Sequence, residues 1–236
     1  MGVQSETHHR IALNPQTWAV IGEVAPPERA TQAMQSAHQH LNTPFGLALM
    51  APPYDGSDPR VAGTSTYPPG AKENGGIFAH ANTWAVIAAA RIGWSESAYQ
   101  YYRQLMPLSR TDPDHYAVEP YVYCGNIAGP THPQFGYGRN AWLSGTASWM
   151  YVAATQWILG IRPTFEGLQV SPVIPVSWSG FTARRTFRSV TYHITVQRLG
   201  EGSQVTLAVD GQPIAGNIIP FPPAGQKDVS VTATLK

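Results

Sequence analysis

The hydrophobic pattern of this chain changes its period once, well past the midpoint. In the stretch 30–41, apolar residues return every three or four positions, which is the spacing of an amphipathic helix. In the stretches 182–187 and 191–197, apolar and polar residues alternate and glycine-containing turns follow, which predicts β-hairpins. We therefore expect a helical domain at residues 1–163 and a small β-sandwich domain of jelly-roll type at residues 164–236.

The helical part is expected to consist of successive helix pairs. Asn14 before Pro15 is a typical N-cap, and the helix that it starts should end at Pro26-Pro27, where the next helix begins. A second pair is predicted at 81–92 and 95–105. Antiparallel helix pairs are the repeating unit of α/α barrels and solenoids. The sequence therefore predicts a mainly α fold with a β appendage.

Composition limits the function classes. With 236 residues, 43% of them hydrophobic, the chain can build a substantial core. The formal net charge is only +1, so no basic surface for nucleic acid or anionic lipid is expected. Cys124 is the single cysteine, which excludes an internal disulfide, and no secretory leader pattern opens the sequence. These features predict a cytoplasmic protein with a small or neutral partner.

One long segment carries no charge at all, from Asn140 to Ile161. Its length would suit a membrane span, but polar residues such as Ser144, Thr146 and Gln156 are spread through it. A helix that is apolar all round is also typical of a large core. We therefore expect this segment to be buried in the protein, with no membrane partner.

A dense motif from Tyr67 to Trp84 precedes the third predicted helix. Two prolines fix its backbone, Gly75 and Gly76 permit close approach of a ligand, and His80 lies where the helix begins. The start of a helix carries partial positive charge and attracts anions. From the residues alone, His80 is either an anion ligand or a satisfied structural histidine.

A second motif of the same kind runs from Gly138 to Trp149. Ser144 and Gly145 offer a hydroxyl and an unhindered backbone N–H, which is how uncharged groups hold phosphate oxygens. The same small residues could serve only to let helices pack closely. The two motifs could converge on one anion.

The segments between the predicted helices are long and rich in tyrosine. Residues 51–76 and 107–139 contain six tyrosines, among them Tyr121, and few charges. Aromatic rings stack on the apolar faces of sugars, although tyrosines can equally seal a loop onto a core. Glu73 and Glu119 are the carboxylates embedded in strong motifs, and either could instead orient its loop. No zinc-type cluster, phosphate-binding glycine loop or Gly-x-Ser-x-Gly motif occurs, so no metal or organic cofactor is expected.

Several of these motifs, in this order and spacing, resemble the inverting glycoside phosphorylases that include cellobiose and chitobiose phosphorylases. The resemblance covers nearly the whole chain. It is carried by the segments Leu13–Ile21, Lys72–His80, Glu119–Tyr123, Trp142–Ala147, Ile158–Pro163, Gly167–Pro175 and Val209–Pro220.

The resemblance implies a fold and an activity. Members of that family have an N-terminal β-sandwich domain, a linker, an (α/α)6 barrel and a C-terminal β domain, and this chain resembles their last third. Residues 1–163 would then be the C-terminal part of the (α/α)6 barrel. The activity would be phosphorolysis of a β-linked disaccharide with inversion, in homodimeric full-length enzymes with inorganic phosphate as co-substrate. The catalytic acid, an Asp, would lie upstream, so no catalytic residue is assigned in this chain.

The resemblance also implies site residues. It assigns phosphate binding to His80, Ser144 and Gly145, and no metal site. Candidates for the sugar side of the pocket are Glu73, Asn82, Trp84, Glu119 and Tyr121.

Two positions depart from the family pattern, and two other functions stay open. Gly125 stands where a Gln that holds the donor sugar is common, and Gly63 stands where cellobiose-specific members tend to carry a Glu. The identity of the acceptor sugar is therefore open. The alternatives are a non-catalytic sugar-binding or assembly fragment and an (α/α)6 glycoside hydrolase, in which two carboxylates would flank a water.

Overall fold

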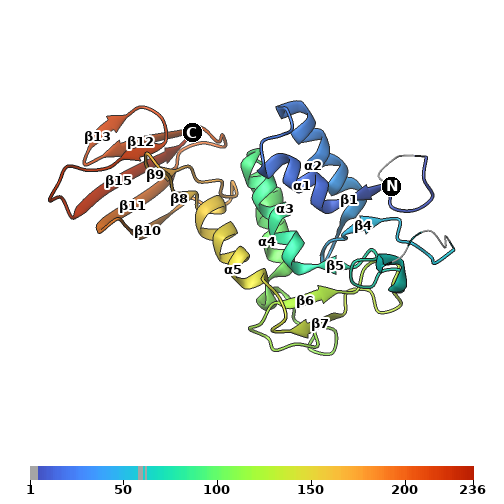
Figure 1. Ribbon diagram of the computed structural model, residues 1–236. Helices are drawn as coiled ribbons and strands as arrows, with labels where there is room; N and C mark the ends of the chain where they lie inside the picture. The colour runs from blue at the N-terminus through green and yellow to red at the C-terminus, as the bar shows by residue number, and fades with distance from the viewer. Residues whose placement is uncertain (1–4, 58–60, 62) are drawn as a thin grey trace. The chain divides into compact units, whose positions relative to one another are not determined.

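The computed structural model describes residues 5–57, 61 and 63–236. The chain divides into two compact units. The first unit comprises Met1–Ile92 and Ser97–Ala153, and the second unit comprises Gly93–Glu96 and Ala154–Lys236 (Figure 1).

Five α-helices lie in the described residues, and α3 is central to the first unit. Ten of its thirteen residues are buried, and it contacts both α1 and α5. Its many alanines allow this close approach, because they add little side-chain volume between helices. The helices are α1 (Leu13–Ile21), α2 (Pro27–Leu41), α3 (Ala79–Arg91), α4 (Ser95–Leu105) and α5 (Thr146–Val152), and a π-helical segment, Ala153–Ile158, follows α5.

The predicted start of the first helix is wrong by two residues. The N-cap is Ala12, not Asn14, and the Leu13 N–H donates to the Leu49 carbonyl oxygen at 2.8 Å. Pro15 is then the third helical residue, where its missing N–H costs nothing because the first four N–H groups of a helix have no intrahelical partner. The helix also ends at Ile21, before Pro26-Pro27. The second helix is confirmed, with Pro27 in its first turn and a buried stripe of Ala30, Met34, Ala37 and Leu41.

Short strands join the helices of the first unit. β1 (Ile11–Ala12) pairs with β4 (Met50–Ala51), and β2 (Asn42–Thr43) pairs with β3 (Gly46–Leu47). A three-stranded sheet has the order β5-β6-β7, with β5 at Ile77–Phe78, β6 at Cys124–Ile127 and β7 at Gly138–Ala141. Tyr116 secures the loop before β6: its hydroxyl donates to the Val122 carbonyl at 2.7 Å and accepts from the Cys124 N–H at 3.1 Å.

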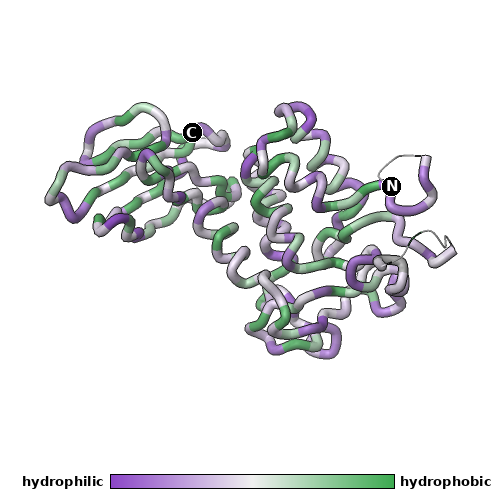
Figure 2. Tube along the Cα trace, viewed as in Figure 1, coloured by the Kyte–Doolittle hydropathy of each residue, from purple (hydrophilic) through white to green (hydrophobic). Residues whose placement is uncertain are grey.

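The second unit contains two sheets. The larger sheet has the order β10-β11-β15-β12-β13, and β11 and β15 are parallel while its other neighbours are antiparallel. Alternate side chains of β11 and β15 are buried, among them Tyr192, Ile194 and Val231. Figure 2 shows that the strands of this unit carry both hydrophobic and hydrophilic residues. The strands are β10 (Gly180–Phe187), β11 (Val190–Arg198), β12 (Val205–Val209), β13 (Gln212–Ile214) and β15 (Asp228–Leu235) in the larger sheet, and β8 (Ile161–Pro163), β9 (Gly167–Val170) and β14 (Ile218–Pro220) in the smaller.

The predicted mainly α fold with part of an (α/α)6 barrel is wrong. The structure is 29% helix and 28% strand, and the described residues form no barrel of paired helices. The physical reason is that the proline- and glycine-rich segments between helices pair as short strands, while α5 has no helical partner following it in the chain. The jelly-roll prediction for the C-terminal sheets also fails to match the parallel pairing of β11 with β15. The strands predicted at 182–187 and 191–197 are confirmed as β10 and β11.

The uncharged segment 140–161 is divided among several elements. It contributes the end of β7, α5, the π-helical segment and the start of β8. No helix in the part of the chain that the structure describes is long and apolar enough to cross a bilayer.

Candidate functional site

His80 and Gly145 lie against each other in the first unit. His80 is the second residue of α3, and Gly145 directly precedes α5. A Cβ atom added to Gly145 would lie 3.0 Å from Cε1 and 3.3 Å from Nδ1 of the imidazole. Any larger residue would therefore require the His80 ring to move by a few tenths of an ångström. The structure thus brings together one residue from each of the two motifs that the sequence singles out.

The His80 imidazole has an unused polar atom. Nε2 is buried and has no hydrogen-bond partner among the described residues. Burial lowers the pKa of His80 below its ordinary value of 6.5, which favours the neutral ring at pH 7. A neutral imidazole can donate one hydrogen bond and accept another, and leaving a buried polar atom unpaired is costly. Nε2 of His80 is therefore a candidate for contact with a ligand.

Ser144 is engaged in the turn that starts α5. Its Oγ accepts from the Thr146 N–H at 3.1 Å and forms a short hydrogen bond with the Thr146 hydroxyl. Ser148 closes the same turn by donating to the Gly145 carbonyl at 3.0 Å. These bonds fix the backbone of Gly145 next to His80. A ligand contact from the Ser144 hydroxyl would have to be added to this capping role or compete with it.

Two tryptophans lie beside His80, Trp84 of α3 and Trp149 of α5. With Trp18 of α1, which contacts Trp84, they form what we call the aromatic cluster. The Trp84 ring lies 5.0 Å from the His80 ring, and Trp149 lies 6.3 Å from His80 and 6.1 Å from Trp84. Trp18 approaches Trp84 edge-on at 5.2 Å. Of these three, only Trp84 was predicted from the sequence as a site residue. Trp149 could have been found from its spacing, since it lies four residues after Gly145 and so one helical turn along the same face.

Asn82 lies on a different face of α3 from His80. Residues two positions apart in a helix point about 200° apart. The Asn82 side chain is buried; it accepts from the Leu47 N–H at 2.6 Å and donates to the carbonyls of Leu47 and Phe78 at 2.8 and 2.9 Å. The structure therefore gives Asn82 a structural role, joining β3 to α3.

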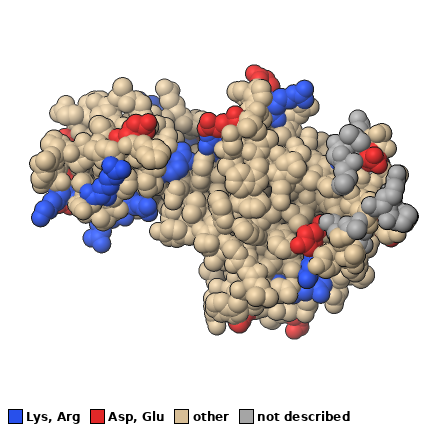
Figure 3. Space-filling view, in the orientation of Figure 1, with Lys and Arg blue, Asp and Glu red and all other residues tan. Residues whose placement is uncertain are grey.

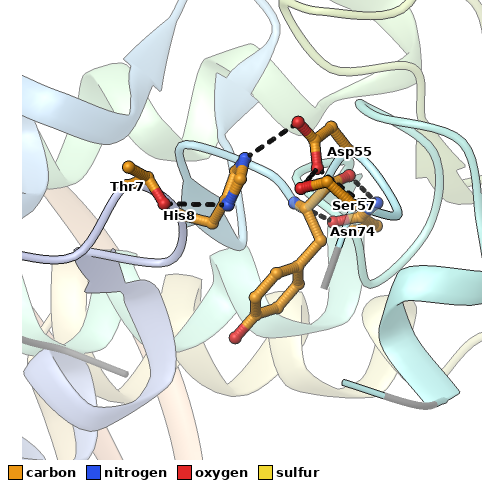
Figure 4. A network of polar contacts seen from close by, with 6 residues as sticks. Thr7, His8, Asp55, Ser57 and Asn74 are labelled. Carbon is orange, nitrogen blue, oxygen red and sulfur yellow. Dashed lines mark hydrogen bonds and ion pairs between the residues drawn. The ribbon is translucent and has the colours of Figure 1, made fainter. Parts of the chain in front are cut away.

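Glu73 is exposed on a turn that its neighbour Asn74 holds in place. The buried Asn74 amide accepts from the Tyr54 N–H at 2.8 Å and donates to the carbonyls of Tyr54 and Tyr67, both at 2.8 Å. Figure 4 shows Asn74 beside the polar contacts of the preceding loop, in which Ser57 donates to Asp55 and His8 approaches Asp55 at 3.4 Å. The turn that carries Glu73 is thus held by hydrogen bonds from Asn74 to the backbone of both Tyr54 and Tyr67.

Glu119 and Tyr121 belong to a more exposed group. Trp142 donates its indole N–H to Glu119 at 2.9 Å, and this bond lowers the pKa of the carboxyl group. The side chains of Tyr121, Trp142 and Leu143 are all at least 70% exposed. Beside Glu119 lies a hollow of about 540 Å³, lined also by Arg110, Tyr116 and Val118. This group is joined to the His80 region through the chain, because Leu143 directly precedes Ser144.

The described residues contain no cluster of three or more His, Cys, Asp or Glu side chains that could hold a metal ion.

The family of the chain follows from comparison with known proteins. The family model of the glycosyl hydrolase 94 superfamily, catalytic domain, matches residues 1–160. The chain belongs to this superfamily, which confirms the resemblance drawn from the sequence motifs.

Individual relatives are phosphorylases by name. The chain is 36% identical to N,N'-diacetylchitobiose phosphorylase of Vibrio proteolyticus, over 93% of this chain and 28% of the relative. It is 35% identical to N,N'-diacetylchitobiose phosphorylase of Vibrio furnissii, over 100% of this chain and 29% of the relative. It is 33% identical to solabiose phosphorylase of Paenibacillus borealis, over 94% of this chain and 29% of the relative. The chain therefore spans less than a third of the length of these curated relatives.

Among solved structures, a family GH92 α-mannosidase from Bacteroides thetaiotaomicron matches 95% of this chain and 24% of its own, with a TM-score of 0.38 and 10% identity. A similarity this low supports no inference about fold or function.

Proposed function

We propose that this chain is the C-terminal portion of an inverting disaccharide phosphorylase and contributes its phosphate site. Membership of the superfamily and the names of the relatives support the reaction class. The small share of each relative that the chain covers supports the assignment to one portion of a longer enzyme. The substrate would be a β-linked disaccharide of the cellobiose or chitobiose type, with inorganic phosphate as co-substrate and no metal or organic cofactor.

The observation that carries the proposal is the buried Nε2 of His80 beside Gly145, for which the described part of the chain offers no hydrogen-bond partner. Phosphate is already anionic, so it can attack the anomeric carbon without a general base. It then needs donors that hold it in position. His80 would donate Nε2–H, Gly145 its unshielded backbone N–H, and Ser144 its hydroxyl. The bond between the anomeric carbon and the leaving oxygen breaks, and that oxygen takes its proton from the Asp expected upstream.

Replacement of His80 with Ala tests this proposal. Losing one hydrogen bond to an anion should weaken phosphate binding by about ten-fold or more, as measured by titration calorimetry on the 236-residue chain. The matched control is His193→Ala, because His193 is exposed on β11 and bonds Asp228 at 2.9 Å in the second unit. Equal phosphate affinity in the His80 variant and in the unchanged chain would contradict the proposal.

A sugar-binding or assembly module is the second candidate function. It is favoured by the exposed side chains of Tyr121, Trp142 and Leu143 beside Glu119, since aromatic rings and acceptors of this kind bind sugars. This reading predicts that the chain binds a disaccharide such as N,N'-diacetylchitobiose but not phosphate. Titration with each compound separately distinguishes the two functions.

A further inference from the structure

Trp84 lies one helical turn after His80 on α3. Residues four positions apart share a face of a helix, so both side chains leave α3 in the same direction. Their ring centroids are 5.0 Å apart and the ring planes are inclined by 53°. Both rings also neighbour Trp149 of α5, the helix that Gly145 precedes.

Like His80, Trp84 has a buried polar atom that lacks a hydrogen-bond partner. Its Nε1–H is buried and has no hydrogen-bond partner among the residues that the structure describes. An indole N–H can only donate, and buried donors in folded proteins are nearly always paired. Its ring neighbours Trp18 and Trp149 carry only donors of the same type, so they cannot accept from it. The His80 imidazole, 5.0 Å away between ring centroids, could accept, but Nε2 of His80 and Nε1 of Trp84 are both without a partner among the described residues. An acceptor from outside the cluster would satisfy Trp84.

We propose that Trp84 is a further phosphate-binding residue, which donates Nε1–H to the same anion that His80 contacts. This inference rests on the proposed function. Two donors from one helical face suit an ion with several acceptor oxygens, because each donor can be paired with its own oxygen. The geometry thus moves Trp84 from the sugar side of the pocket, where the sequence placed it, to the phosphate side.

Observation of the indole N–H groups by NMR tests this assignment directly. The chain has seven tryptophans, and Trp84→Phe identifies which indole cross-peak belongs to Trp84. On titration of the unchanged chain with inorganic phosphate, the Trp84 cross-peak should move downfield, with the dissociation constant found by calorimetry. Trp84→Phe should weaken phosphate binding by about ten-fold. The matched control is Trp18→Phe, which removes an indole from the same cluster and should change the phosphate affinity less than two-fold.

The outcomes separate this inference from the proposed function. If His80→Ala weakens phosphate binding while the Trp84 cross-peak stays in place and Trp84→Phe has no effect, Trp84 is not a phosphate ligand and the proposed function stands. If neither variant changes phosphate affinity, both ideas fall. If Trp84→Phe weakens disaccharide and phosphate equally, Trp84 supports the fold, and the inference is overturned. Should Trp84→Phe not fold, the six other indole cross-peaks can each be assigned with a Phe variant of that tryptophan, and the remaining cross-peak belongs to Trp84. Its response to phosphate in the unchanged chain then tests the inference.

Discussion

The two units of this chain stabilise their interiors in different ways. Among the described residues, the six buried polar ones are Thr17, Asn74, Asn82, Thr83, Asn126 and Thr146, and all of them lie in the first unit. In the second unit, the backbone is hydrogen-bonded along long paired strands. The buried side chains of β11 and β15 are apolar, apart from that of Tyr192. Where the backbone is irregular, buried amides must satisfy it. The candidate site lies in the unit that needs such side chains.

The surfaces differ as well. Figure 3 shows several Lys and Arg side chains on the second unit, whereas most of the viewed face of the first unit carries no charged side chain. Four predictions would break or sharpen the comparison between the units.

The largest effect is expected for Ile194→Ala in the second unit. Ile194 is 1% exposed on β11, and truncation of such a side chain leaves a cavity that typically costs about 2–5 kcal/mol. Urea unfolding measures the loss of stability. The control is Gln197→Ala, an exposed position on the same strand, which should cost less than half as much. Similar losses of unfolding free energy in both variants would show that the alternation of buried and exposed side chains does not stabilise this sheet.

Asn82→Ala should destabilise the first unit by about 3 kcal/mol, at about 1 kcal/mol for each of its three hydrogen bonds. The backbone groups of Leu47 would be left buried without these partners. The free energy of unfolding checks this, with the exposed Asn14→Ala as the control within about 0.5 kcal/mol of the unchanged chain. A stable Asn82→Ala variant that lost only sugar binding would instead support the sequence prediction for this residue.

Gly145→Ala should act on binding more than on stability. The φ of Gly145 is −77°, which alanine adopts without strain, but the new Cβ would lie 3.0 Å from His80. Displacement of the imidazole should weaken phosphate binding by about ten-fold, or about 1.4 kcal/mol. Calorimetry measures the affinity and a thermal melt the stability. Gly200→Ala in the second unit is the control, and unchanged phosphate affinity in the Gly145 variant would count against the contact with His80 as the basis of the site.

The smallest effect is the pH dependence that His80 contributes. Because burial lowers the pKa of His80 in the folded state, the unfolded chain binds the proton more readily, and stability falls as pH drops below about 6.5. Urea unfolding from pH 7.5 to 5.5 should show a shallower loss in His80→Gln than in the unchanged chain. His9 and His132, whose pKa values are also lowered mainly by burial, should contribute the same sign and leave a residual slope. An identical pH profile in the variant would contradict this account.

What the sequence could predict depended on the regularity of each element. The helix α2 and the strands β10 and β11 were predictable, because their hydrophobic periods are sustained over many residues. The fold class was not, since strands as short as β5 carry no period. The role of Asn82 was hidden because α3 is apolar on nearly every face, so no pattern shows which face meets β3.

For the candidate site, the motifs identified His80 and Gly145, and the structure added their contact. Trp18 was missed because its partner, Trp84, lies on another helix, and Trp149 was missed although its spacing from Gly145 could have indicated it. The sequence predictions for phosphate and sugar binding at these residues stay predictions until binding is measured.

The Asn74 amide has a consequence for how the effect of a single substitution would spread. By bonding Tyr54 and Tyr67 at once, it joins two positions thirteen residues apart in the chain at one side chain. Loss of that amide would therefore leave the backbone groups at both positions without their shared partner, and would release the turn that carries Glu73 from each of them together.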